Sequence, residues 1–165
     1  MSEEATTTQN TYLTFTLDEE QYAVDVRKVK EVLEYTRITR VPRTKEYMRG
    51  VINLRGSVVP VVDLRMKFGL SETEQTISTS IIVAEIEMSN ETVVVGSLAD
   101  SVQEVINMDT EQIESTPRMG SKINTEFIKG IGKHGGRFIL VLDFDRIFSA
   151  AELAEVVEKE EAPVQ

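Results

Sequence analysis

The sequence predicts a mainly β fold built from two small, related barrels, and three observations support this prediction. Short β-branched runs alternate with turn signals along most of the chain, a pattern typical of about eight to ten strands in a barrel or sandwich. No segment has the apolar periodicity of a long interior helix. One stretch of the chain, residues 46–68, occurs a second time at residues 126–148.

The first half of the chain begins with an alternating apolar and polar strand, YLTFTL, at residues 12–17. The polar DEEQ predicts a hairpin turn into a second strand, YAVDV. The following KVKEVLEYTRITRVP fits either a helical turn or a strand at its start, and its β-branched content favours a strand toward Val41. TKEYMRG predicts a single helical turn with Thr44 as its N-cap and Gly50 past its end. VINLR and VVPVVDL are then expected to form a hairpin, joined by Gly56 and Ser57.

The first unit ends with a short helix, RMKFGL, which Gly69 is expected to end, and the second unit follows it. SIIVAEIE and TVVVGSLA predict a hairpin, and SVQEVINM continues as a strand. NTEFIKG predicts another helical turn, and RFILVLDF predicts the last strand. The sequence further predicts a terminal helix at residues 149–158 and mobile tails at residues 1–10 and 155–165.

The repeat aligns residues 46–68 with 126–148 without a gap and gives six identities, where background composition would give about one or two. Upstream, VRKVKEVL at residues 26–33 resembles ADSVQEVI at residues 99–106. We therefore expect one unit at residues 11–72 and another at 76–148, with approximate boundaries and terminal segments that can cross between them. Units this small are expected to share one hydrophobic core, with function at their junction.

Composition excludes several classes of function. The net charge of −10 and the low aromatic content disfavour binding to nucleic acid or to anionic membranes. The N-terminal residues lack the features of a signal peptide, and no apolar run reaches the roughly 20 residues of a spanning helix, so we expect a cytoplasmic protein. Basic residues gather between Arg37 and Arg49, either as a solvated face or as a positive patch for an acidic partner.

No set of residues predicts catalysis. The chain has no cysteine, and its single histidine, His134, lies in a glycine-rich turn, which leaves a transition metal short of ligands. Asp63, Asp143 and Asp145 follow strands just before helical patterns, where capping is the expected role of an aspartate. We therefore expect no enzyme activity, no metal and no cofactor.

The two copies differ at the hairpin turn. The first copy carries Arg55 there, and the second carries Gly135. Arginine suits forked contacts with carboxylates, and the topology makes Glu31 the nearest candidate partner. A solvent-facing arginine without a partner is the alternative, and the sequence leaves both open.

Three segments together resemble the CheW family of chemotaxis coupling proteins. They are FTLDEEQYAVDVRKVKEVL, VPRTKEYMRGVINLRGSVVPVVDLRMKF and EFIKGIGKHGGRFILVLDFDRIF, and the resemblance extends over residues 11–150. The wider family includes the regulatory domain of the kinase CheA and the adaptor half of CheV, but this chain resembles the free-standing adaptor. The resemblance implies two five-stranded SH3-like barrels around a shared hydrophobic core.

The resemblance also implies a function and a binding surface. It implies a non-catalytic adaptor that couples the regulatory domain of the histidine kinase CheA to the signalling tips of chemoreceptors and helps to build their arrays. The implied receptor and kinase surface comprises Val29, Glu31, Arg55, Ile81 and Val105. A further kinase contact is implied at Pro117, Arg118 and Met119, although this loop lacks the aromatic residue that some members carry there. A chemotaxis-like pathway with an output other than motility remains the alternative.

Overall fold

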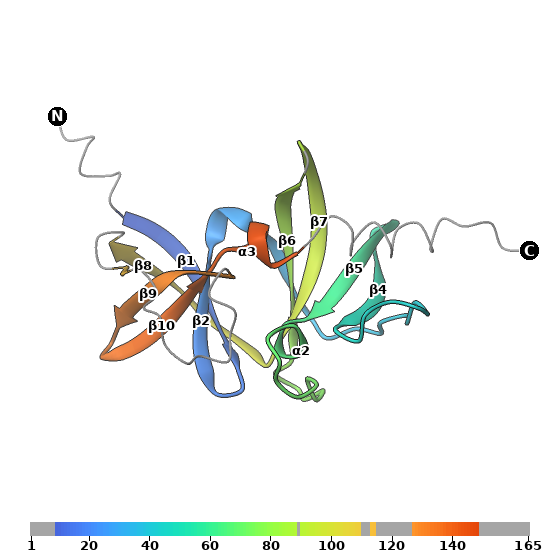
Figure 1. Cartoon of the computed structure of the whole chain (residues 1–165), viewed down its shortest axis with the longest axis horizontal. Helices are drawn as coiled ribbons and strands as arrows, with labels where there is room; N and C mark the ends of the chain where they lie inside the picture. Colours follow the sequence, from blue (N-terminus) through green and yellow to red (C-terminus); the bar gives the residue numbers. More distant parts are fainter. Residues whose placement is uncertain (1–8, 89, 110–112, 115–126, 149–165) are drawn as a thin grey trace, which may run out of the picture.

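The described residues of the chain form two five-stranded β-sheets, which lie side by side in the computed structural model (Figure 1). The structure describes residues 9–88, 90–109, 113–114 and 127–148. The first sheet has the strand order β8-β1-β2-β10-β9, and the second has the order β3-β6-β7-β5-β4. The predicted mainly β fold with two five-stranded units is therefore confirmed.

The strands of the first sheet are β1 (Gln9–Leu17), β2 (Glu20–Asp25), β8 (Ser101–Asp109), β9 (Ile128–His134) and β10 (Arg137–Leu142). Those of the second sheet are β3 (Val29–Glu34), β4 (Met48–Leu54), β5 (Ser57–Asp63), β6 (Ser80–Met88) and β7 (Glu91–Ala99). The described residues also include three single-turn helices, namely the 3₁₀ helix η1 (Val26–Lys28) between β2 and β3, the α-helix α2 (Leu64–Lys67) between β5 and β6, and the α-helix α3 (Phe144–Ile147) after β10. The expected terminal helix at 149–158 and both expected tails fall wholly or largely outside the described residues.

The two sheets exchange strands between the halves of the chain. Residues 11–72 hold β1 to β5 and residues 76–148 hold β6 to β10, yet β1 and β2 join the first sheet with β8 to β10. In return, β6 and β7 join the second sheet with β3 to β5. After this exchange the two sheets have the same arrangement of strands. In the first sheet β2 pairs in parallel with β10, and in the second β7 pairs in parallel with β5, so each parallel pair joins strands from the two halves of the chain.

The hydrophobic core spans both sheets. Its main cluster combines Phe15 and Tyr22 of the first sheet with Ile82 and Ile86 of the second, and all four side chains are buried. Aromatic contacts run through it, with ring centroids 6.4 Å apart for Phe15 and Phe144. Each sheet also has a smaller cluster of its own. Because the main cluster belongs to both sheets, the prediction of a shared core is confirmed.

Local features of the repeat recur in the structure. Asp63 and Asp143 are the N-caps of α2 and α3, and their side chains accept hydrogen bonds from the first-turn backbone, as predicted. Their own N–H groups donate to the carbonyls of Tyr47 and Phe127 at 2.7 and 2.9 Å. One expectation was wrong: residues 44–50 form turns and the start of β4 rather than a helical turn, because pairing with β5 already begins at Met48. Of the second expected helical turn, NTEFIKG, residues 124–126 lie outside the described residues, and residues 128–130 begin β9.

Gly50 lies where β4 meets the chain segment around Thr39. A Cβ atom added at this position would stand 2.1 Å from the Thr39 carbonyl oxygen, and the backbone φ is +144°. We expect Gly50→Ala to lower the free energy of unfolding by about 2–4 kcal/mol in urea denaturation. In the control, Gly132→Ala, the new methyl group meets first the flexible Met108 side chain, so the loss should be much smaller. Equal losses would contradict this explanation.

Candidate partner-binding surface

The hairpin of β4 and β5 turns through Arg55 and Gly56, which both have positive φ, +51° and +90°. This is the pattern of a type I′ hairpin turn. In the second copy, the hairpin of β9 and β10 makes the same kind of turn with Gly135 and Gly136 at +61° and +79°. A non-glycine residue in this left-handed region costs about 1–2 kcal/mol. The turn itself therefore favours glycine, and Arg55 needs another explanation.

Arg55 forms an ion pair with Glu31 of β3. Its guanidinium donates to both carboxylate oxygens, from Nη1 to Oε1 at 3.4 Å and from Nη2 to Oε2 at closer range. The hydrogen bond from Arg55 lowers the pKa of Glu31 below its ordinary value, and the same bond raises the pKa of Arg55. The Arg55 side chain is 66% exposed and that of Glu31 is 26% exposed, so the pair presents a held charge to solvent.

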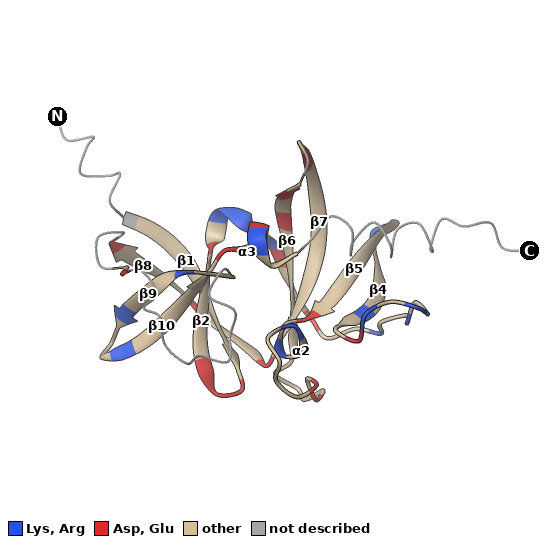
Figure 2. Cartoon of the chain, viewed as in Figure 1, with Lys and Arg blue, Asp and Glu red and all other residues tan. Residues whose placement is uncertain are grey.

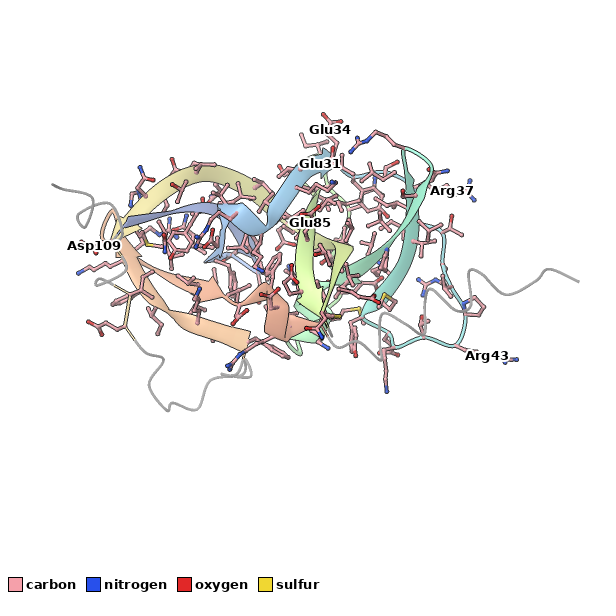
Figure 3. The ribbon with its side chains drawn as sticks, turned by 90° about the horizontal axis from the view of Figure 1, so that it is seen from above. Glu31, Glu34, Arg37, Arg43, Glu85 and Asp109 are labelled. Carbon is pink, nitrogen blue, oxygen red and sulfur yellow. The ribbon has the colours of Figure 1, made fainter. Side chains whose placement is uncertain are left out.

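A β-bulge in β3 accompanies this pairing. Val29 lies opposite Ala84 of β6, but Glu31 lies opposite Val83, so Lys30 is an extra residue on β3. Bulges redirect side chains and often border functional sites. Figure 3 shows Glu31 on β3 with Glu34 and Glu85 nearby, whereas Asp109 lies far from them at one end of the molecule.

An apolar groove of about 560 Å³ adjoins the Arg55 turn. Its lining comes from β3, β5, β7 and the end of β4: Lys30, Leu54, Arg55, Ser57, Val58, Val59, Pro60, Thr92, Val93 and Val94. Val58 is 50% exposed beside the turn. A groove with valine and proline walls and two cations at its rim fits the apolar face of an amphipathic segment.

The other predicted residues lie in different surroundings. Val29 is half-buried against the shared core at the start of β3. Ile81 is fully buried in the cluster of the second sheet, so it has no surface to offer a partner and its predicted contact role is corrected to a core role. Val105 is 56% exposed on β8, in the other sheet. Pro117, Arg118 and Met119 lie outside the described residues.

The sequence did not predict two exposed valines near this ion pair. Val32 directly follows Glu31, and Val58 lies three residues after Arg55. Val32 is the repeat counterpart of Val105, and Glu104 is the counterpart of Glu31. The second copy therefore keeps the glutamate and the exposed valine but lacks the arginine. Alternation along β3, with every second residue exposed, is the signal that could have identified Val32.

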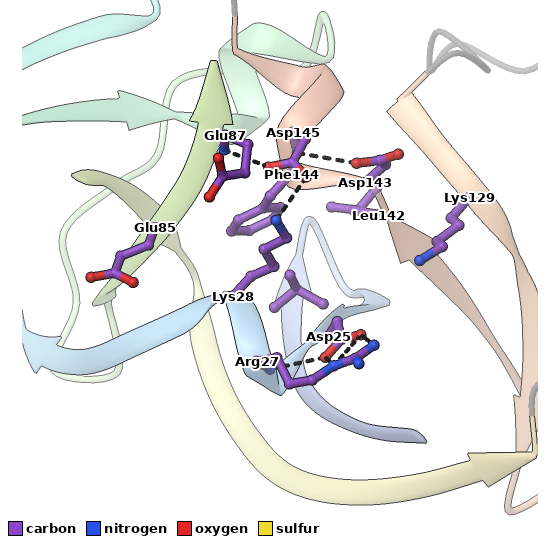
Figure 4. Close-up of a pocket in the computed structure, with 11 residues that line it drawn as sticks. Asp25, Arg27, Lys28, Glu85, Glu87, Lys129, Leu142, Asp143, Phe144 and Asp145 are labelled. Atoms are coloured by element: carbon purple, nitrogen blue, oxygen red, sulfur yellow. Dashed lines mark hydrogen bonds and ion pairs between the residues drawn. The ribbon is translucent and has the colours of Figure 1, made fainter. Parts of the chain in front are cut away.

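A second hollow of about 400 Å³ lies between the sheets, and its polar lining is largely paired (Figure 4). Lys28 of η1 and Asp145 of α3 form an ion pair at 2.8 Å, and Asp145 also accepts a hydrogen bond from the Glu87 backbone at 3.0 Å. An ion pair of Lys30 and Glu85 at 3.3 Å links the rims of the two hollows. The contact of Asp145 with Glu87 joins α3, which follows β10 of the first sheet, to β6 of the second, whereas the Lys30–Glu85 pair lies within the second sheet. The groove beside Arg55 is the more apolar of these two hollows.

Comparison with known proteins identifies the family of this chain. The family model described as "CheW-like domain" matches residues 11–152. The chain belongs to the CheW-like family. As a member it is a chemotaxis adaptor. Within the described part of the chain, no helix has the length and apolar character required to cross a bilayer.

Named relatives and a solved structure agree with this membership. The CheW-like chain is 38% identical to "Chemotaxis protein CheW" of Thermotoga maritima over 145 residues, which are 88% of this chain and 91% of that one. It is 35% identical to the protein of the same name from Klebsiella aerogenes, over 88% of this chain and 85% of the relative. A crystal structure of the scaffolding protein TtCheW from Thermoanaerobacter tengcongensis matches with a TM-score of 0.77 and 34% identity, covering 86% and 88% of the two chains.

The lowered pKa of Glu31 predicts how the ion pair responds to acid. A carboxylate with a depressed pKa contributes stability above its ordinary value of 4.5, and this contribution is lost as the pH falls through the lowered pKa. We therefore expect side-chain NMR to report a Glu31 pKa below 4.5 in the CheW-like protein and a return toward that value in Arg55→Gly. Equal Glu31 pKa values in the two proteins would contradict the pairing.

Proposed function

We propose that this CheW-like protein is a non-catalytic cytoplasmic adaptor that joins the regulatory domain of the histidine kinase CheA to the signalling tips of methyl-accepting chemoreceptors. By bringing the two together it helps to build receptor–kinase arrays. The names of its relatives, which are chemotaxis and scaffolding proteins, support this role. Its strongly acidic character supports protein partners rather than nucleic acid or lipid.

One observation carries the proposal, namely the Arg55–Glu31 pair at the rim of an apolar groove. Chemoreceptor signalling tips are helical hairpins, and an amphipathic helix binds a groove through apolar anchors at helical spacing. A charge held at the rim fixes the orientation of such a helix and rejects partners of the wrong sign. In this proposal Val29, Glu31, Arg55 and the exposed Val32 and Val58 form the principal surface.

Two outlying predictions belong to the same proposal. Val105, the counterpart of Val32 in the other sheet, is exposed and would contribute to a partner surface there. The second copy has Gly135 at the position that corresponds to Arg55. Pro117, Arg118 and Met119 would make the second kinase contact. Substitution of Val105, or of residues 117–119, should weaken assembly less than substitution of Arg55, because Arg55 is the residue proposed to orient the partner.

Reconstitution from purified components tests the adaptor role. We expect the kinase to sediment with membranes that contain the chemoreceptor only when the CheW-like protein is added, and the CheW-like protein should sediment with the receptor. The matched control replaces the CheW-like protein with an equal amount of an unrelated acidic β protein. Kinase that sediments equally well without the CheW-like protein would contradict the coupling role.

A further inference from the structure

The hairpin of β9 and β10 carries a second exposed surface, at the end of the molecule opposite the β4–β5 hairpin (Figure 1). Phe138 is 71% exposed there, and the Lys133 ammonium group lies over its ring at 6.0 Å. Phe138 and Lys133 are cross-strand partners, as are Arg137 and His134. We call Lys133, Arg137 and Phe138 the cationic-aromatic face.

The apolar character of this face extends beyond Phe138. Leu140 and Ile131 form the cross-strand pair two residues further from the turn, and both are half-buried. Residues two apart on a strand lie on the same side of a sheet. Phe138, Leu140 and Ile131 therefore lie on the same side of the hairpin, where Leu140 packs against the main core cluster and Phe138 and Lys133 lie nearest the turn.

The repeat shows that folding does not require these side chains. The counterparts of Lys133, Arg137 and Phe138 in the β4–β5 hairpin are Asn53, Ser57 and Val58, a neutral set on the same kind of turn. The second hairpin thus lacks an arginine at its turn and carries two cations and an aromatic ring beside it. A difference of this kind between two copies of one hairpin indicates a separate binding role.

The charge of the face opposes that of the molecule. The chain has a net charge of −10, yet the ribbon is coloured for Lys or Arg at the tip of β9 and at the start of β10 (Figure 2). In the described part of the chain neither Lys133 nor Arg137 forms an ion pair. A small positive face attracts a local acidic group, whereas the whole molecule repels extended polyanions and anionic membranes. The exposed ring adds an apolar anchor of the kind that dominates protein interfaces.

We propose that the cationic-aromatic face binds an acidic protein segment that carries an apolar side chain. Carboxylates of the segment contact Lys133 and Arg137, and its apolar side chain covers the ring of Phe138. This site is separate from the groove beside Arg55, so its occupant and the occupant of that groove can bind together. The proposal does not depend on the identity of the partners at Arg55.

Titration of the ¹⁵N-labelled full chain with a synthetic peptide tests the proposal. The peptide has a single leucine between pairs of glutamates, and its controls replace the leucine with serine or the glutamates with lysines. We expect saturable amide shifts over residues 131–140 with the acidic leucine peptide, weaker at high salt, and much smaller shifts with either control peptide.

Variants separate this face from the rest of the chain. Phe138→Ser and the double change Lys133→Glu with Arg137→Glu should each weaken peptide binding at least about tenfold, without changing the thermal midpoint because these side chains are exposed. Val58→Ser, the matched change in the other hairpin, and Arg55→Gly should leave peptide binding unchanged. The proposal is overturned by absence of saturable shifts, by shifts that map elsewhere, by self-association through this hairpin, or by binding of phosphatidylserine vesicles in preference to the peptide.

Discussion

Replacing Arg55 with glycine should weaken binding of the chemoreceptor signalling domain or of the kinase regulatory domain about tenfold, because it removes the charge that orients the partner at the rim of the groove. The same change should leave the free energy of unfolding equal to that of the wild type or slightly higher. Glycine adopts the φ of +51° at this turn without the cost that arginine carries, as Gly135 does in the second copy. Isothermal calorimetry gives the affinities, and thermal denaturation gives the stability.

A second exposed arginine provides the control for this experiment. Arg27 forms an ion pair with Asp25 at 2.6 Å, and its side chain is 74% exposed, but it lines the hollow between the sheets rather than the groove beside Arg55. Arg27→Ala should therefore preserve both affinities. If Arg55→Gly bound both partners as tightly as the wild type did, the proposed role of Arg55 would be wrong.

Replacing Asp63 with alanine should produce the largest loss of stability, about 3–5 kcal/mol in urea denaturation. Asp63 is fully buried, and its carboxylate pairs with Arg49 at 2.9 Å. It also accepts hydrogen bonds from the Thr73 backbone at 3.0 Å and the Thr73 hydroxyl at 2.7 Å, besides capping α2. Alanine would leave the Arg49 guanidinium, which is 15% exposed, and the buried Thr73 groups without these partners.

The repeat offers a matched control for Asp63. Asp143 caps α3 in the second copy, but its side chain is 29% exposed and its ion pair with Arg146 is longer, at 3.6 Å. Asp143→Ala should therefore cost about 1 kcal/mol, the usual cost of a lost N-cap. Similar losses for the two variants would mean that the buried network around Asp63 contributes little beyond capping.

The sequence predicted the strands and the two hairpin turns because alternation and glycine placement are local signals. It also predicted the Arg55–Glu31 pair as one of two alternatives, since only the first copy carries an arginine at its turn. These inferences depend on neighbouring residues or on a comparison of the two copies, and neither requires knowledge of long-range packing.

The sequence indicates that terminal segments can cross between the two units, but it does not predict which hairpin joins which sheet. The β1–β2 hairpin and the β6–β7 hairpin both place apolar side chains on a buried face, so either could complete either sheet. The choice between them depends on packing in the shared core, where Phe15 and Tyr22 meet side chains that follow in the chain by 40 residues or more. Patterning along the chain carries no information on that choice.

Burial at single positions was the other limit. Ile81 and Val32 are both β-branched strand residues, yet Ile81 is buried between two neighbouring strands of the second sheet and Val32 is 41% exposed at its edge. Period-two alternation gives the side of a strand but not its place in the sheet order. The position of β6 between β3 and β7 therefore decides that Ile81 belongs to the core, whereas the exposure of Val32 follows the alternation along β3.

Chemical-shift mapping of the ¹⁵N-labelled chain with the purified chemoreceptor signalling domain, and then with the kinase regulatory domain, is the decisive test of the proposed binding surface. We expect the amides of Glu31, Val32 and residues 54–58 to shift or broaden with at least one of these partners, and Arg55→Gly to abolish most of the change. Unperturbed amides in these segments, with both partners bound elsewhere on the chain, would contradict the proposed surface.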